Sequence, residues 1–318
     1  MIKEIKIRMR EIGKNNASFS QVYKSLSGIK TKALRFLPDK TYLKLKYKTS
    51  TGKKLHLDNP ITFNEKLQWM KLYDRNPIYT VMVDKYAARQ YVAERIGEDH
   101  LIPLLGVWDH PEDIDFKALP NQFVLKCNHN SGDGMCICKD KSKLDIEKVI
   151  KGLRKGLSQD YYLAGREWPY KNVPRKIICE QFLSDGTGSL ADYKVHNFDG
   201  VPKVILVCKD RFSSKGVSED FFSENWTKLP FKRPGTRISE EDIPRPTELE
   251  EMIHLAKILS KGFKFLRTDF YIIQGKVYFG ELTLFPGDGF IGFEPDKYDK
   301  ILGDWLNLKP NERKFSQE

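Results

Sequence analysis

Two acidic residues inside neighbouring apolar stretches constrain this chain most. Asp269 and Glu281 stand among aromatic and β-branched residues, on either side of Gln274-Gly275. Alternating apolar stretches joined by a glycine-bearing turn predict a β-hairpin. Carboxylates in such surroundings are costly to bury unless a positive charge accompanies them. A divalent cation that carries a nucleotide would supply that charge, so the pattern favours an ATP-dependent enzyme.

The length of the turn decides whether the two carboxylates can meet. A two-residue loop pairs Ile273 with Lys276 and leaves Asp269 and Glu281 on opposite faces, because side chains alternate along a strand. A three-residue loop pairs Ile272 with Lys276 and brings both carboxylates to one face. A metal site requires this second register, so we favour the three-residue loop. The shared face would then carry Arg267, Asp269, Glu281 and Thr283. The alternative is a plain salt-bridged hairpin, in which the arginine neutralises the glutamate.

The composition is that of a globular protein with an ion-rich surface. Of the 318 residues, 40% are hydrophobic and 31% are charged. No run of about 18 apolar residues is present, so no membrane-spanning helix is expected. The N-terminus lacks the apolar core of a signal peptide, which predicts a cytosolic protein. The five scattered cysteines are expected to be reduced and buried.

The net charge of +11 is concentrated near the N-terminus. Residues 1–60 hold 15 Lys and Arg against 4 Asp and Glu, and the other 258 residues hold 39 of each kind. This basic segment is either a solvated flank or a surface for an anionic lipid or polymer. It would allow peripheral association with the inner face of the cell membrane. No nucleic-acid-binding motif accompanies it, so nucleic acid is not an expected partner.

Periodicity and turn residues predict an α+β protein with antiparallel sheets. Thr62 and Glu65 form a capping-box pattern before an apolar run. Residues 1–50 are expected to be helical, with breaks near Gly28 and Pro38. Further helices are expected at 62–72, 80–96, 144–157 and 248–259 and from about 298. Strands are expected at 101–108, 123–127, 135–138, 176–182, 192–198 and 203–209, besides the 265–283 hairpin. Residues 221–246, rich in Pro, Lys and Arg, are expected to form a long surface excursion.

An ordered set of short segments resembles the ATP-grasp superfamily, and within it the TupA-like amide ligases of teichuronopeptide biosynthesis. The segments are NPITFNEK (59–66), DK (84–85), FVLKCNH (123–129), EQFL (180–183), DYK (192–194), Asp269 and ELTLFPG (281–287). The resemblance covers about residues 55–305. It implies an ATP-grasp fold, in which two α+β subdomains hold a nucleotide between antiparallel sheets, with a helical N-terminal region.

The resemblance also implies how the chain is divided. The expected parts are a basic helical segment (1–55), a helical region on the substrate side (56–120), a subdomain with a phosphate lid (121–183) and a subdomain with the metal site (184–318).

The resemblance assigns the nucleotide to residues from both subdomains. Lys85 and Lys126 would bind phosphates, and Lys194 would reach them from the opposite subdomain. Lys126 ends a strand before a loop whose N–H groups can wrap the terminal phosphates. The lid would consist of Asn130, Ser131 and Gly132, and the adenine-binding hinge of Glu180, Gln181, Phe182 and Leu183. Plainer interpretations remain. Lys126 could be a solvated lysine at a strand end, residues 130–132 an ordinary hairpin turn, and residues 180–183 a buried strand end.

The resemblance places Mg²⁺ at the acidic hairpin. Asp269 and Glu281 would hold one or two ions together with phosphate oxygens, and Mn²⁺ is an alternative. Thr283 stands where the wider superfamily has an asparagine, and its hydroxyl is the weaker ligand. Arg211 and Lys215, together with Arg267, would neutralise an acyl-phosphate. The alternative for residues 209–215 is a solvated basic turn.

The reaction implied by the resemblance is amide formation. A substrate carboxylate would attack the γ-phosphate of MgATP, and an amine would then attack the acyl-phosphate. No strong general base is evident in the sequence. By family association, the carboxylate would belong to a uronic acid or related sugar acid of a bacterial surface polysaccharide, such as capsule or O-antigen. The amine would be an amino acid or amino alcohol.

Three other functions stay open at this point. A sugar or small-molecule kinase on the same fold would release ADP without an amine. A polysaccharide glycosyltransferase would usually need an Asp-x-Asp motif at a strand end, whereas Asp113-Ile114-Asp115 lies in a loop-like acidic segment. A non-catalytic polyanion-binding protein would depend on the basic N-terminal segment.

Overall fold

The computed structural model describes residues 35–308 except 189, 212 and 214. The helices expected before residue 35 lie outside this part of the chain. The strands are β1 (Leu104–Trp108), β2 (Phe123–Cys127), β3 (Cys136–Cys138), β4 (Ile177–Gln181), β5 (Asp192–Phe198), β6 (Val201–Lys209), β7 (Ser218–Ser223), β8 (Phe265–Ile273) and β9 (Lys276–Thr283). The α-helices are α3 (Asp39–Thr51), α4 (Phe63–Tyr73), α5 (Ile78–Val83), α6 (Ala88–Ile96), α7 (Ile146–Leu157), α8 (Tyr162–Gly165), α9 (Leu249–Ser260) and α10 (Lys297–Trp305).

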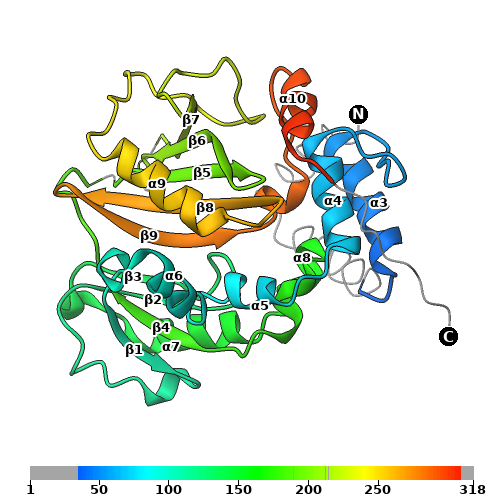
Figure 1. The fold of residues 1–318 in the computed structure, drawn as a ribbon. Helices are drawn as coiled ribbons and strands as arrows, with labels where there is room; N and C mark the ends of the chain where they lie inside the picture. Colours follow the sequence, from blue (N-terminus) through cyan, green and yellow to red (C-terminus); the bar gives the residue numbers. More distant parts are fainter. Residues whose placement is uncertain (1–34, 189, 212, 214, 309–318) are drawn as a thin grey trace, which may run out of the picture.

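The strands form two antiparallel sheets. One has the order β1-β4-β2-β3 and the other β7-β6-β5-β8-β9. Figure 1 shows the two sheets one below the other, with β9 on the side of its sheet that faces the smaller one, and α3, α4 and α10 gathered at one end. The predicted α+β class with antiparallel sheets is confirmed.

Each sheet has one apolar face covered by a helix. In the smaller sheet, Phe123, Leu125, Ile177 and Cys179 are buried in a core completed by α7. In the larger sheet, α9 packs on β5, β6 and β8. Because side chains alternate along a strand, the polar residues between these positions lie on the opposite faces. Those opposite faces carry the candidate site.

The β8–β9 hairpin corrects the predicted register. Ile273 pairs with Lys276, so the loop has two residues, and the three-residue loop was wrong. Both loop residues have positive φ, at 50° and 78°, as a type I′ turn requires. A β-bulge at Gly280 adds one residue to β9 and pairs Asp269 with Glu281. The two carboxylates therefore share a face, but through a bulge that simple alternation does not predict.

Gly280→Ala should disturb the carboxylate pair more than it disturbs the fold. A Cβ atom at Gly280 would lie 3.2 Å from the Asp269 carbonyl oxygen and 3.1 Å from the Tyr271 ring, so the bulge would have to shift. We expect turnover to fall at least about tenfold, because small misplacements of reacting groups are costly. The matched control is Gly275→Ala in the same hairpin, which should cost about 1 kcal/mol of stability at unchanged turnover. Equal losses in the two variants of the ADP release that the resemblance implies would argue against a role for the bulge.

The single helix predicted over 80–96 is in fact two helices, α5 and α6. Asp84 interrupts it, because its Oδ1 accepts hydrogen bonds from the backbone N–H groups of Tyr86 at 2.8 Å and Ala87 at 3.2 Å. Such local side-chain bonds compete with helical ones. Lys85 then donates its backbone N–H to the Asn128 carbonyl at 3.1 Å. The break in the helix therefore lets a backbone hydrogen bond hold Lys85 next to the end of β2.

Several other elements match or depart from expectation. The capping box of Thr62 and Glu65 is present, and the hairpin turn after β5 contains Asp199-Gly200 with positive φ at both residues. The sequence missed β7, because residues 221–223 were assigned to the surface excursion.

All five cysteines are free, and four of them are buried. Among residues 35–308, apart from the three omitted, the structure contains no helix long and apolar enough to cross a membrane.

Candidate functional site

The smaller sheet contributes a lysine and a buried carboxylate. Lys126 Nζ of β2 lies 2.6 Å from Glu180 Oε2 of β4, and Arg89 of α6 lies 3.4 Å from the other Glu180 oxygen. The Glu180 side chain is only 8% exposed, so both of its oxygens are engaged by cations. Glu180 thus fixes Lys126 at the open face of the sheet rather than presenting a free carboxylate. Gln181 next to it donates its backbone N–H to Pro103.

Lys85 ties the helix break to the glycine-bearing loop after β2. Its Nζ donates to the Asn130 carbonyl at 2.6 Å, and the Asn130 side-chain amide donates to the Gly156 carbonyl at 3.2 Å. Ser131 and Gly132 are exposed, and Gly132 has φ 86° with open space around it. The loop is therefore anchored at its first residue and open at its tip.

The larger sheet contributes a buried ion-pair network. Asp269 is 1% exposed, and Arg267 donates to its two oxygens at 2.6 Å each. Lys194 pairs with the same carboxylate and lies 2.6 Å from Asp192 Oδ2. Arg211 reaches that Asp192 oxygen at 3.0 Å. Acidic and basic side chains therefore alternate on this face of the neighbouring strands β5 and β8.

Cations from both sides of the site act on Glu281. Its Oε1 accepts from Arg267 at 2.8 Å and from the Thr283 hydroxyl at 3.3 Å, and 36% of its side chain is exposed. Burial acts to raise the pKa of Glu281, but four cations lower it to about 2. Two of them come from the smaller-sheet side and two from the larger sheet: Lys85 and Lys126, and Arg267 and Lys194.

Acid should destabilise the protein partly through Glu281. Its pKa is about 2 in the folded protein against an ordinary 4.5. A carboxyl group whose pKa is lower in the folded state stabilises the fold above its unfolded pKa, and this contribution disappears as pH falls through the folded pKa. The loss should therefore run from about pH 5 down to about pH 2. Urea unfolding of Glu281→Gln should show a flatter stability curve over that range, and an unchanged slope would contradict this.

The donor set suits one Mg²⁺ ion better than two. Arg267 and Thr283 both donate to Oε1 of Glu281, and no hydrogen bond to Oε2 is found among the described residues. Among the same residues, no group of three or more His, Cys, Asp or Glu side chains could hold an ion. A magnesium ion here would need phosphate oxygens to complete its shell, which is its usual habit in proteins. Asp269 could join only if Arg267 and Lys194 released one of its oxygens.

The structure gathers most of the predicted residues around Glu281. The residues joined to this network by the contacts and charges above are Lys85, Lys126, Asn130, Glu180, Lys194, Arg211, Arg267, Asp269, Glu281 and Thr283. Lys215 does not join them: it pairs with Glu240 at 3.0 Å, and both side chains are more than 60% exposed. Phe182 and Leu183 are half-buried in the segment that follows β4.

Besides Arg89, which pairs with Glu180, two residues in or beside the larger sheet were not predicted. Asp192 stands two residues before Lys194 on the same face of β5, a spacing that could have identified it, and its Oδ1 is buried without a partner in the described part of the chain. Arg233 lies 3.4 Å from Glu219, and the charges of Arg267 and Asp269 act on it. It belongs to the irregular segment after β7, where no sequence pattern indicates its position.

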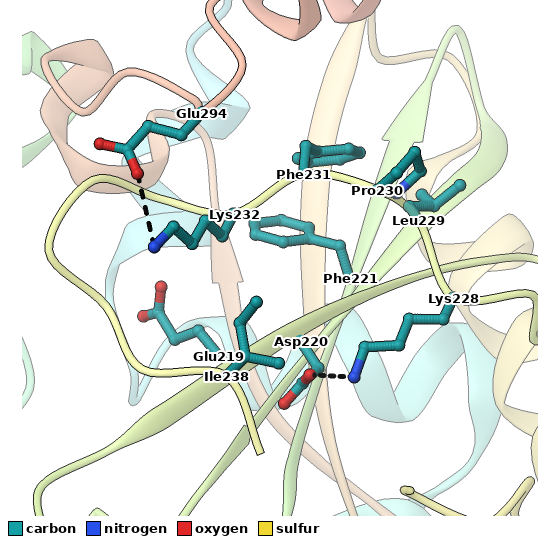
Figure 2. A pocket seen from close by; sticks show the side chains of 10 residues that line it. All are labelled: Glu219, Asp220, Phe221, Lys228, Leu229, Pro230, Phe231, Lys232, Ile238 and Glu294. Carbon is teal, nitrogen blue, oxygen red and sulfur yellow. Dashed lines mark ion pairs between the residues drawn. The ribbon is translucent and has the colours of Figure 1, made fainter. Parts of the chain in front are cut away.

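A hollow of about 520 Å³ opens at the far edge of the larger sheet (Figure 2). Its acids face lysines: Asp220 lies 2.8 Å from Lys228, and Glu294 lies 3.5 Å from Lys232. Strands β6 and β5 separate it from Asp269, because Phe221 of β7 pairs with β6, β6 with β5 and β5 with β8. The hollow therefore lies away from Asp269 and Glu281, and it is linked to the network only at Glu219, which lines it and pairs with Arg233.

Comparison with known proteins identifies the family. The family model described as TupA-like ATPgrasp matches residues 65–307. The chain belongs to this family. Membership confirms both the resemblance and the ATP-grasp fold class, and it agrees with the prediction of an ATP-dependent ligase. Among curated proteins, none has a significantly similar sequence.

Solved structures to which this chain is similar include two D-alanine–D-alanine ligases. The enzyme from Bacillus anthracis, complexed with ATP, is 18% identical with a TM-score of 0.39, over 64% of this chain and 55% of that one. The enzyme from Helicobacter pylori is 14% identical with a TM-score of 0.41, over 77% of this chain and 69% of that one. The D-cycloserine synthetase DcsG is 14% identical with a TM-score of 0.39, over 73% and 72%. The first match spans about half of the ligase, so this chain's reaction must be inferred from its own residues.

Proposed function

We propose that this chain is an ATP-dependent carboxylate–amine ligase that works through an acyl-phosphate. The observation that supports this most is the contact of Arg267 with the partly exposed Glu281, whose pKa is lowered by this arginine and by the charges of three lysines, Lys85, Lys126 and Lys194. Positive charges gathered around one partly open carboxylate suit a polyphosphate carrying a metal ion. Family membership supports the same proposal.

The nucleotide would lie between the sheets. Lys85 and Lys126 would bind phosphates from one side and Lys194 from the other, each giving up its present carboxylate or carbonyl partner in part. The exposed tip of the lid, Ser131 and Gly132, would close over the terminal phosphates with its backbone N–H groups. Segment 180–183 would contact the adenine. In that segment the main chain and the half-buried Phe182 and Leu183 are better placed than the Glu180 carboxylate, which is ion-paired.

Magnesium would be held mainly by Glu281, with Asp269 and the Thr283 hydroxyl as the further ligands proposed from sequence. The ion supplies charge neutralisation at the phosphates undergoing transfer. Arg267 touches both carboxylates, so it would orient them and face the transferring phosphoryl group. Arg211 would neutralise the substrate carboxylate or the acyl-phosphate formed from it. Lys215, paired with Glu240 away from this network, is a weaker candidate for that role.

The substrates would be a sugar-acid carboxylate and a small amine, as the resemblance implies. A uronic acid in a bacterial surface polysaccharide such as capsule or O-antigen, or in its precursor, is the proposed acceptor, and an amino acid or amino alcohol is the proposed nucleophile. The protein would act in the cytoplasm. The basic segment near the N-terminus would bring it to the inner face of the membrane, whose anionic lipids attract basic segments.

The test is ADP release by purified protein with MgATP. The panel combines glucuronic and galacturonic acids with glycine, alanine, lysine and ethanolamine. The ligase proposal requires ADP release that depends on both a carboxylate and an amine, and that is lost in Lys126→Ala. ADP release without an amine, with a stable phosphorylated product, would instead support a kinase on the same fold. No ADP release with any pair, in protein that binds MgATP, would count against both enzymes for these substrate classes.

A further inference from the structure

The loop that carries the proposed lid, residues 129–134, lies against the C-terminal end of α7, and the proposed function gives this contact no role. Glycines on both sides allow the close approach. A Cβ atom at Gly156 of α7 would lie 2.8 Å from the Asp133 carbonyl oxygen and 2.9 Å from the Gly134 Cα atom. The backbone of the loop therefore packs directly on the backbone of the helix.

Gln159, two residues after the end of α7, contacts this loop with its carbonyl and with both atoms of its side-chain amide. Its carbonyl oxygen lies 3.2 Å from His129 Nε2, and its side-chain oxygen accepts a hydrogen bond from the Asn130 amide at 3.3 Å. Its side-chain nitrogen donates to the Asp133 carboxylate. Its backbone N–H donates to the Gly156 carbonyl at 3.1 Å. One residue thus joins both ends of the loop to the last turn of α7.

The loop is buried where it begins and exposed in its middle. His129 and Asn130 are 2% and 3% exposed. Ser131 and Gly132 are exposed, and Gly132 has open space around it. Because Gln159 binds the loop on both sides of these two residues, its bonds limit free motion of the loop to its tip.

Another bond of the loop would weaken when a nucleotide binds. Lys85 Nζ donates to the Asn130 carbonyl at 2.6 Å. In the proposed function this ammonium group binds a phosphate, so it can no longer hold the loop to the same extent. The side-chain bonds of Gln159 use no group that is proposed to bind phosphate, because the lid would bind through its backbone N–H groups. These bonds can therefore persist in the nucleotide complex.

We propose that Gln159 is a positioning residue for nucleotide binding, which holds both ends of the loop so that the N–H groups of Ser131 and Gly132 stay close to where the terminal phosphates bind. This inference rests on the proposed function and deepens it. A loop that is already ordered loses less conformational entropy when its ligand binds, and binding is therefore tighter. Gln159 would act on the affinity for the nucleotide and would touch neither the nucleotide nor the metal ion.

The test combines nucleotide binding with hydrogen exchange of the loop. Gln159→Leu keeps the approximate size of the side chain and removes its hydrogen bonds to Asn130 and Asp133. We expect the affinity for a non-hydrolysable ATP analogue with Mg²⁺, measured by calorimetry, to fall about tenfold. Amide exchange in residues 130–134 should become about tenfold faster, because the loop opens more often.

A control and a rescue separate positioning from a general effect on the fold. Gln122→Leu removes an exposed amide that donates to the Lys139 carbonyl at 3.1 Å, and it should leave both measurements unchanged. Gln159→Glu sets a second carboxylate against Asp133 and should weaken nucleotide binding. Adding Asp133→Asn to Gln159→Glu exchanges donor and acceptor, because the asparagine amide can donate to the new carboxylate, and should restore the affinity. This pair also decides the matter if Gln159→Leu fails to fold.

Tighter nucleotide binding by Gln159→Leu would show that Gln159 holds the lid away from the phosphates, and it would overturn the inference. Unchanged exchange, unchanged affinity, or a double variant no better than Gln159→Glu would overturn it as well. In each of these cases a wild-type protein that binds the ATP analogue leaves the proposed function standing. A wild-type protein that binds no ATP analogue would overturn the proposed function together with this inference.

Discussion

Glu281→Gln should reduce ADP formation by about 10³-fold, the loss typical of removing a major electrostatic contact from a catalytic site. The reason is its position: Lys85 and Lys126 act on it from the smaller-sheet side, and Arg267 holds it within the larger sheet. The substitution removes the charge that assembles this group, and with it the proposed magnesium ligand. Turnover of MgATP with the best substrate pair measures the effect.

The fold should survive this change, because 36% of the Glu281 side chain is exposed and the amide keeps its shape. Glu294→Gln is the matched control. Glu294 is also half-exposed and also paired with a cation, Lys232, but it borders the hollow at the far edge of the sheet (Figure 2). It should keep wild-type turnover. A Glu281→Gln protein with turnover within a few-fold of Glu294→Gln would remove Glu281 from the centre of this account.

Arg267→Met should destabilise the protein by about 3 kcal/mol and also inactivate it. Asp269 is 1% exposed and depends on Arg267 for two bonds of 2.6 Å. Removing one partner of a buried ion pair leaves a poorly compensated charge, which is the expensive case. Lys194 remains beside Asp269, so the loss should stay at the lower end of the usual range. Denaturant unfolding gives the stability and ADP release gives the activity.

A second substitution separates the two effects. Arg267→Met/Asp269→Asn removes the stranded charge, so part of the stability should return while activity stays lost. Arg245→Met is the surface control, because Arg245 pairs with an exposed Glu250 and such pairs contribute at most about 1 kcal/mol. If the double variant were no more stable than Arg267→Met, the buried charge would not be the cause of the destabilisation.

The sequence predicted the acidic hairpin but not how it is built. Alternation of apolar residues identified both strands. The apolar surroundings singled out Asp269 and Glu281, and the resemblance then assigned Mg²⁺ to them. The pairing of these two residues depends on the bulge at Gly280, and a single extra residue changes the face of everything beyond it. The side-chain pattern fits several registers, so only the structure could choose among them.

Contacts between residues far apart in the chain were the main limit on what the sequence could predict. From the sequence, Asp84 is expected to continue the helix. In the structure its side chain accepts hydrogen bonds from the backbone of Tyr86 and Ala87, and these bonds interrupt the helix. Arg233 reaches the network from an irregular segment after β7. Each of these depends on tertiary contacts that propensity and spacing do not contain.

The most direct test of the account is a crystal structure of the protein with Mg²⁺ and a non-hydrolysable ATP analogue. It should show the triphosphate between the two sheets, with Lys85, Lys126 and Lys194 on its oxygens and the ion bound to Glu281. A triphosphate bound elsewhere, or an ion at this site that leaves Glu281 without a metal contact, would contradict the central claim.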